Sequence, residues 1–304
     1  MASATFSTLR LTVHDHPLEL STIHRPGPKP AILFLHGFGS CKEDLHDLIF
    51  LPSLQDHAFI AYDAPGCGAS LHHGPSSDLT IPFLVATAQA VLSHFHISSF
   101  YLIGHSTGAL TALMLASALQ QQPQFQLQSQ HRQQQKQQQK LTLLAFINIE
   151  GILSPENCPF SRSLYKSLTQ DNEEQESDPL KTLTTALTTS PTYGHIQLAS
   201  LLPLRIRPAA IAPLVTSTVD LSWKNLLGRF VRLSCPAMFM FGDQNRNCSF
   251  LDQLEANGVE LVRIPMCGHF PMYSNPAKML RRIEGFLREL GGYIFGGFRV
   301  MAWR

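Results

Sequence analysis

A strand-like pattern meets a helix-like pattern at residues 100–109, which read FYLIGHSTGA. Ser106 lies there between two glycines, each two residues away. Because glycine lacks a Cβ atom, a strand and a helix can approach closely around such a turn. The turn strains the backbone of its central residue and exposes the hydroxyl at the carboxyl end of a sheet, where a helix N-terminus favours negative charge. Ser106 is therefore a candidate nucleophile.

The composition indicates a globular protein, with 304 residues of which 44% are hydrophobic and 15% charged. The 23 basic and 22 acidic residues nearly cancel, so no single-sign field predicts binding to nucleic acid or to an anionic membrane. No apolar run resembles a secretory signal or reaches the roughly 20 residues of a membrane span. Six cysteines without a CxxC pair indicate free thiols in a reducing compartment. We predict a cytoplasmic protein.

Strand-like and helical segments alternate along most of the chain. A hairpin is predicted over 9–23. The later strands are predicted at Ala31–Leu35, Ala58–Tyr62, Phe100–Ile103, Leu141–Ile149, Ala237–Phe241 and Val259–Ile264, and the helices at 80–96, 107–119 and 276–290. This alternation predicts an α/β fold with a mainly parallel sheet that helices cover on both faces.

Two stretches interrupt the alternation. Residues 120–140 contain 13 glutamines in 21 positions and are interpreted as a low-complexity insertion without a catalytic role. Residues 151–230 are too long for a loop and contain helical fragments, so they are expected to form a helical cap or lid. The core domain then comprises 1–150 and 231–304, and its tail, 291–304, is expected to be an extra strand or a loose end.

Two further side chains complete the candidate site. A serine needs a base to remove its proton, and His269 follows the last predicted strand, at the same sheet edge as Ser106. Asp243 follows the preceding strand and is our candidate for the acid that orients the imidazole. Glu150 is the rival acid, because it also follows a strand. We prefer Asp243, which directly precedes the last strand, and expect Glu150 to anchor the cap or line the pocket.

Four motifs carry a family resemblance: HGFGS at 36–40, DAPGCG at 63–68, GHSTG at 104–108, and the pair GD at 242–243 with GH at 268–269. The order Ser–Asp–His, each after a strand, is typical of the alpha/beta-hydrolase arrangement. Over about residues 8–290 the chain resembles the alpha/beta-hydrolase superfamily, in its helical-cap branch. The resemblance implies a mostly parallel eight-stranded sheet flanked by helices, with an inserted cap.

The resemblance also implies an oxyanion hole. In similar proteins two backbone N–H groups bind the oxyanion, one just after the nucleophile and one just after the His-Gly pair. Here these are the amides of Thr107 and Phe38. His36 is expected to be a packing and hydrogen-bonding residue, and Asp63 to be structural rather than catalytic.

The predicted reaction is acyl transfer to water. A serine hydrolase would cleave a carboxylic ester, lactone or thioester of a small to medium hydrophobic substrate through an acyl-enzyme on Ser106, without metal or organic cofactor. Epoxide hydrolases and haloalkane dehalogenases of this fold have an aspartate as nucleophile. Three alternatives stay open: an acyltransferase, a carbon–carbon bond hydrolase with the same triad, and a low-turnover ligand receptor. The expected partner is a small hydrophobic acyl substrate.

Overall fold

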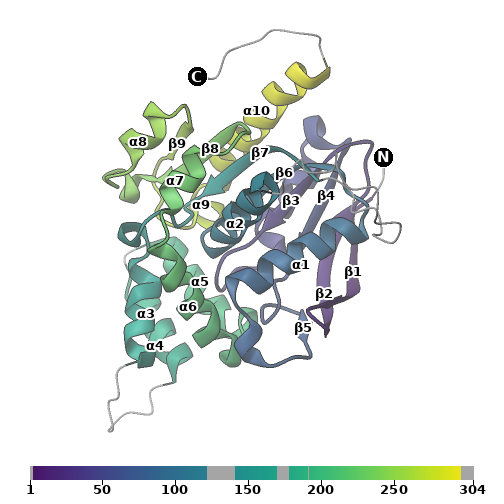
Figure 1. The fold of residues 1–304 in the computed structure, drawn as a ribbon. Helices are drawn as coiled ribbons and strands as arrows, with labels where there is room; N and C mark the ends of the chain where they lie inside the picture. Colours follow the sequence, from purple (N-terminus) through teal and green to yellow (C-terminus); the bar gives the residue numbers. More distant parts are fainter. Residues whose placement is uncertain (1–2, 122–140, 170–177, 191, 296–304) are drawn as a thin grey trace.

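The structure is a computed structural model that describes residues 3–121, 141–169, 178–190 and 192–295. These residues form one sheet in the order β1-β2-β4-β3-β6-β7-β8-β9, with a two-residue strand, β5 (Leu71–His72), paired to β2 (Figure 1). The eight strands of the main path agree with the predicted number, and β5 is a ninth. The predicted Gln-rich insertion lies, from residue 122 onward, outside the described residues.

The sheet begins with an antiparallel hairpin. Strands β1 (Thr5–Val13) and β2 (His16–Arg25) pair along their whole length. The turn between them places His14 and Asp15 at φ of 48° and 66°. Aspartate tolerates this left-handed backbone better than most residues, which fits the predicted turn.

The remaining main-path strands, apart from the antiparallel β2–β4 contact, pair in parallel, and the central ones are buried along almost their whole length. Burial on both faces explains why they read as continuous apolar runs in the sequence. They are β3 (Lys29–Leu35), β4 (His57–Tyr62), β6 (Ser99–His105), β7 (Thr142–Ile149), β8 (Ala237–Gly242) and β9 (Glu260–Ile264).

Helices pack on the sheet. Helices α1 (Ile81–His94) and α2 (Thr107–Gln121) lie side by side across its front in Figure 1. Helix α10 (Pro276–Phe295) packs against β9 and against the 3-10 segment η1 (Lys42–Phe50). Since α10 continues to Phe295, the first part of the predicted tail is helical, and residues 296–304 lie outside the described residues.

Four helices form a separate layer, at the lower left of Figure 1. This α3–α6 layer consists of α3 (Pro159–Thr169), α4 (Pro179–Thr188), α5 (Tyr193–Arg205) and α6 (Pro208–Ser222). The short helix α7 (Leu226–Val231) returns to the sheet, because the Phe230 ring packs edge-on against Phe146 at a centroid distance of 5.4 Å. The layer therefore ends before residue 230, the predicted end of the cap.

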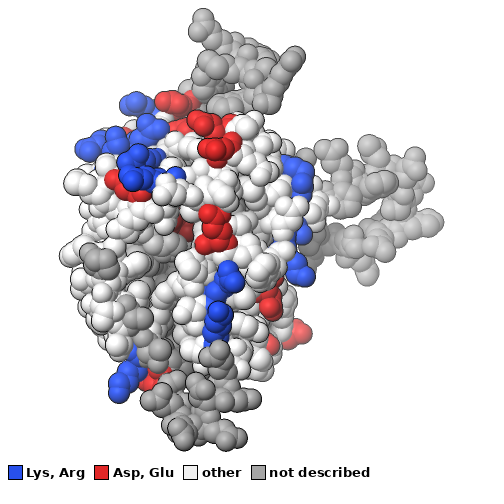
Figure 2. Space-filling model, turned by 90° about the vertical axis from the view of Figure 1, so that its left-hand side faces the viewer, with Lys and Arg blue, Asp and Glu red and all other residues white. Residues whose placement is uncertain are grey.

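Charges of both signs are interspersed on the surface. On the face shown in Figure 2, small groups of Lys and Arg alternate with Asp and Glu on a mostly uncharged background. Exposed pairs such as Arg282–Glu260, 2.8 Å apart, join some of them. Among the helices of the described ranges, none has the length and apolar character that crossing a bilayer requires.

Candidate active site

Ser106 occupies the turn between β6 and α2 with a left-handed backbone, at φ 53°. Its amide donates to the carbonyl of Ile149 on the neighbouring strand, at 3.0 Å. A Cβ atom added to Gly108 would lie 2.2 Å from the Leu35 carbonyl oxygen, and one added to Gly104 would lie 2.5 Å from Ala109 Cα. Only glycine fits at either place, so the two glycines permit the tight turn that the motif predicted.

His269 contacts the Ser106 hydroxyl directly. It lies between β9 and the short helix α9 (Pro271–Ser274), and its Nε2 is 2.8 Å from Ser106 Oγ. The structure thus brings together two candidate residues that are 163 positions apart. At this distance the imidazole can accept the serine proton.

Glu150 lies behind the imidazole. Its Oε2 is 3.6 Å from His269 Nδ1, and the residue is 3% exposed. The Gly242 amide donates to Oε1 at 2.6 Å and the Asn245 side-chain amide donates to Oε2 at 2.7 Å. Glu150 also has a left-handed backbone, at φ 50°, at the end of β7. Two donors and a strained turn therefore aim this carboxylate at the histidine.

Asp243 does not reach His269, contrary to the contact that the sequence led us to expect. Its carboxylate accepts hydrogen bonds from the Arg263 side chain and, at 2.8 Å, from the Met266 amide. The Arg263 guanidinium and the Met266 amide lower the pKa of Asp243. The reason lies in the segment η5 (Asp243–Asn245), which begins at this residue: its Asn245 side chain bonds to Glu150, whereas Asp243 bonds to β9 and the loop after it.

His105 is a neighbour of the site that the sequence analysis did not single out. It is fully buried beside the nucleophile, and its Nε2 donates to the His269 carbonyl oxygen at 2.9 Å. Burial, and secondarily the nearby His269, lower the pKa of His105 to about 3. The ring is therefore neutral and supports the backbone of the His269 loop. Its position inside the GHSTG motif was the available signal.

The amides of Phe38 and Thr107 border the same space as Ser106. Within the described part of the chain, neither amide donates a hydrogen bond to another residue. The loop that carries Phe38 lies tightly against the nucleophile, since a Cβ atom on Gly37 would lie 2.9 Å from Ser106 Cβ. Gly39 adopts a φ of 68°, which favours glycine.

A cavity of about 410 Å³ opens over Ser106 and His269. The α3–α6 layer contributes Phe160, Leu187, His195 and Leu198 to its wall, and the core side includes Phe38, Ile152 and Phe270. Among the residues that the structure describes, no Lys or Arg lines it. Such a volume and such an apolar wall are typical of sites for small organic ligands.

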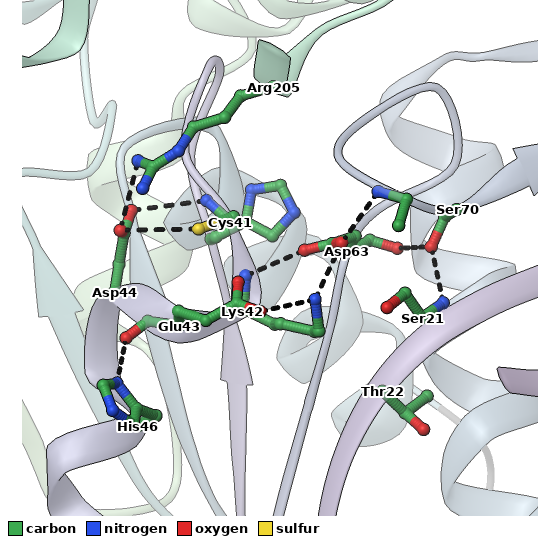
Figure 3. A network of polar contacts seen from close by, with 12 residues as sticks. Ser21, Thr22, Cys41, Lys42, Glu43, Asp44, His46, Asp63, Ser70 and Arg205 are labelled. Carbon is green, nitrogen blue, oxygen red and sulfur yellow. Dashed lines mark hydrogen bonds and ion pairs between the residues drawn. The ribbon is translucent and has the colours of Figure 1, made fainter. Parts of the chain in front are cut away.

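His36 and Asp63 make structural contacts next to the site. His36 Nδ1 donates to the Gly37 carbonyl and its Nε2 accepts from the Ala64 amide, both at 2.8 Å. The Asp63 carboxylate is 1% exposed and binds Lys42 through both the backbone amide and Nζ, at 3.0 and 3.1 Å (Figure 3). Neither residue lines the cavity.

Another buried carboxylate, that of Asp44, joins three parts of the molecule. Asp44, in η1, accepts from Arg205 Nη1 at 3.3 Å and from the Tyr273 hydroxyl at 2.9 Å. Arg205 comes from the end of α5 and points toward Asp44 in Figure 3. Tyr273 belongs to α9 and stacks on Phe270, the residue after His269. Asp44 therefore connects the α3–α6 layer to the segment that carries His269.

No cluster of three or more His, Cys, Asp and Glu side chains suited to a metal ion occurs in the portions of the chain that the structure describes. A hydroxyl, an imidazole, a carboxylate and two backbone amides meet at this sheet edge.

Comparison with known proteins identifies the family. The model of the alpha/beta hydrolase family matches residues 32–282. The chain belongs to the alpha/beta hydrolase family. A curated relative, a serine hydrolase-like protein from Danio rerio, is 33% identical over 87 residues, which are 28% of this chain and 26% of that protein. The matched segment thus spans about a quarter of the relative's length.

Solved structures resemble the whole chain in fold. One is an N-acyl homoserine lactonase variant complexed with N-hexanoyl homoserine, with a TM-score of 0.67 and 13% identity, covering 98% of this chain and 100% of that one. Another is a thermophilic esterase from Thermogutta terrifontis, with a TM-score of 0.66 and 16% identity, covering 93% and 99%. At these identities the likeness concerns the fold.

Proposed function

We propose that the protein is a serine hydrolase that cleaves a carboxylic ester, or a lactone or thioester, through an acyl-enzyme on Ser106. His269 is the general base and acid, and Glu150 takes the role of the third triad member that we first gave to Asp243. The 2.8 Å contact between Ser106 Oγ and His269 Nε2, at the end of a family-specific turn, is the observation that carries the proposal.

Acylation follows from these positions. His269 Nε2 takes the proton of Ser106, and the serine oxygen forms a bond to the substrate carbonyl carbon. The carbonyl oxygen becomes an oxyanion and accepts hydrogen bonds from the Phe38 and Thr107 amides, which are free to donate. His269 then gives its proton to the leaving oxygen or sulfur as the bond to carbon breaks. Glu150 stabilises the imidazolium while the ring is charged.

Deacylation repeats the steps with water. His269 removes a proton from a water molecule, whose oxygen bonds to the acyl carbon. The second tetrahedral intermediate collapses, the acid leaves, and His269 returns the proton to Ser106. Every proton that leaves a nucleophile thus reaches a leaving group, and no other reactant is needed.

The distance from Glu150 to His269, 3.6 Å, exceeds that of a normal hydrogen bond. Catalytic hydrogen bonds are often long in the absence of substrate and shorten in the reacting complex. A second observation supports the role proposed for Glu150: two fixed donors hold its carboxylate in place, and the residue is screened from solvent. Asp243 has no such relation to the imidazole.

The apolar wall over Ser106 supports a small to medium hydrophobic acyl or aryl substrate, with the α3–α6 layer acting as the cap. Leu187 and Leu198 of the layer and Phe38 of the core border this space. A neutral substrate fits best, because the described part of the lining contains Glu150 and Glu156 but no Lys or Arg to pair with a substrate anion.

A panel of p-nitrophenyl esters with acyl chains of graded length tests the proposal. We expect turnover that peaks at a chain the cavity can enclose and that vanishes in Ser106→Ala and His269→Ala. Labelling of Ser106 by a fluorophosphonate, absent in Ser106→Ala, measures nucleophile activation independently of the substrate. Failure of the purified, folded protein both to turn over and to label would contradict the serine mechanism.

The same assays separate the alternatives. Labelling without turnover of esters, lactones or thioesters favours a ligand receptor. Product that depends on an added alcohol favours an acyltransferase. Cleavage of a diketone but not of esters favours carbon–carbon bond hydrolysis, which uses the same triad on a ketone carbonyl.

A further inference from the structure

A second histidine faces the cavity from the α3–α6 layer. His195 lies in the first turn of α5 and lines the same space as Ser106 and His269. Its ring is 5.5 Å from the ring centroid of Phe270, and the His269 ring is 5.0 Å from the same centroid. The two imidazoles thus flank one phenyl ring and cannot lie farther apart than these two distances added. His195 is within reach of a substrate bound at Ser106.

One nitrogen of His195 is already engaged. Nδ1 lies 2.7 Å from Ser190 Oγ. The same Oγ accepts the Thr192 amide at 3.3 Å and can donate its own hydrogen to Nδ1. A ring that accepts at Nδ1 carries its proton on Nε2. Ser190 Oγ also lies 3.2 Å from Thr192 Oγ1, which can donate to it and leave the Ser190 hydrogen for Nδ1. In this tautomer, on which the role of His195 inferred below depends, Nε2 is a donor.

The other nitrogen, Nε2, has no hydrogen-bond partner among the residues that the structure describes. Burial, and then the nearby His269, lower the pKa of His195, so the ring is neutral near pH 7. It offers one N–H and no charge. The ionisable neighbours among the described residues that line the same cavity are Glu150, Glu156, His269 and the thiols of Cys158 and Cys248.

The cavity that His195 lines is partly apolar. Leu187, Leu198 and Phe270 belong to the same lining, and a hydrophobic ligand that fills the space excludes water. A donor that loses its water and finds no partner raises the free energy of the complex. A ligand with an oxygen opposite Nε2 therefore binds more tightly than one without it, by more than the same hydrogen bond would contribute in water. Such a wall discriminates between a ligand with an acceptor at that place and its methylene analogue.

We propose that His195 recognises a neutral acceptor oxygen of the substrate that is distinct from the scissile carbonyl. The substrate class is then an uncharged ester or lactone that carries a second oxygen, as a ketone, amide or ether, a few bonds from the carbon that Ser106 attacks. This inference rests on the proposed function, because it takes Ser106 as the reacting group.

A matched set of three esters tests the inference: p-nitrophenyl hexanoate, and its 4-oxo and 5-oxo analogues. We expect the better oxo ester to exceed hexanoate in kcat/KM by at least about tenfold, the range expected for a buried donor that gains its acceptor. In His195→Phe, which keeps an aromatic ring against Phe270, the ratio of the two kcat/KM values falls toward one. Ser190→Ala, which frees the tautomer, reduces the ratio partway.

Ile196 provides the matched control. It is the next residue on α5, is 46% exposed, and does not line the cavity. Ile196→Ala keeps the wild-type ratio. A ratio near one in the wild type, or a ratio that His195→Phe leaves unchanged, overturns the inference.

A binding measurement separates this inference from the proposed function. In Ser106→Ala, calorimetry compares N-butyl hexanamide with its 4-oxo and 5-oxo analogues, none of which needs to react. Tighter binding of an oxo amide, lost on adding His195→Phe, supports the role of His195 even if no ester is hydrolysed. Equal affinities for all three amides contradict it whatever the turnover.

Discussion

The ends of β7 and β8 each carry a carboxylate, and the two differ in every respect that matters for catalysis. Glu150, after β7, is 3% exposed, accepts two hydrogen bonds from fixed donors and faces His269. Asp243, after β8, lies at the surface and bonds to Arg263 and Met266. Adjacent strand ends therefore do not offer equivalent positions. The donors that surround each carboxylate place Glu150 next to the imidazole and Asp243 next to β9.

The substitution Glu150→Gln tests the difference between the two carboxylates most directly. The amide keeps the shape but cannot stabilise the imidazolium, so we expect kcat/KM for the best ester to fall by about 10³–10⁴-fold. Asp243→Asn is the matched control and should stay within about threefold of the wild type, since it does not contact His269. The reverse outcome, a large loss at 243 and a small one at 150, would restore Asp243 as the acid.

Asp44 extends the comparison to a third carboxylate. Its side chain is 3% exposed and its partner Arg205 is 17% exposed. Asp44→Asn leaves the guanidinium without its counter-charge, so the free energy of unfolding should fall by about 3 kcal/mol in urea denaturation. Asp47→Asn, on the same segment but 56% exposed, should change it by no more than about 0.5 kcal/mol. Equal effects at the two positions would mean that the network adds no stability.

Asn245 lies in η5, the same segment as Asp243, but its side chain bonds to Glu150. It therefore tests whether the donors to Glu150 matter for activity. Asn245→Ala removes a donor to a charged group, and we expect kcat/KM to fall by about 10- to 100-fold. The loss should be much smaller in a Glu150→Gln background, where the carboxylate is already gone. Additive losses in the double variant would show that Asn245 does not act through Glu150.

His105 gives a pH-dependent prediction for the neighbouring strand end, that of β6. The pKa of His105 is about 3 in the folded protein and ordinarily 6.5. Between these two pH values, His105 therefore binds a proton in the unfolded chain but not in the folded one. His105 alone should lower the free energy of unfolding by up to about 1.4 kcal/mol for each unit that pH falls from 6.5 toward 3. Urea titrations of His105→Asn at pH 7 and 4.5 should show a shallower decline. An unchanged slope would place a protonated His105 in the folded protein.

The smallest expected effect is that of Asp243→Asn on stability. The Arg263–Asp243 pair is open to solvent and salt, so the denaturation midpoint should lie close to that of the wild type. Any difference seen at low salt should shrink in 1 M NaCl. A large, salt-independent loss of stability would show that the Arg263–Asp243 pair stabilises the fold more than an exposed ion pair is expected to.

Sequence patterns predicted the parts of the molecule that local chemistry determines. Apolar runs marked the buried strands, and the glycines around Ser106 marked a turn that only they permit. His269 followed from its place after the last strand. The family match confirms the superfamily and the fold.

The choice of acid depended on information that sequence patterns lack. Both Glu150 and Asp243 directly follow strands, and chain order favoured Asp243. The contacts that hold Glu150 near His269 come from Gly242 and Asn245, whose hydrogen bonds to Glu150 span more than ninety residues. The same holds for Asp44, Arg205 and Tyr273, which no local pattern connects. Long-range hydrogen bonds of this kind are visible only once the fold is known.

Asp44, Arg205 and Tyr273 also have a consequence for synthesis. The ribosome synthesises these residues in the order Asp44, Arg205, Tyr273. The Asp44 carboxylate can therefore bind both partners only after residue 273 has been made. His269 lies four residues before Tyr273 and is synthesised at almost the same point. Because Ser106 precedes His269 by 163 residues, their 2.8 Å contact can form only after that long intervening stretch has been made.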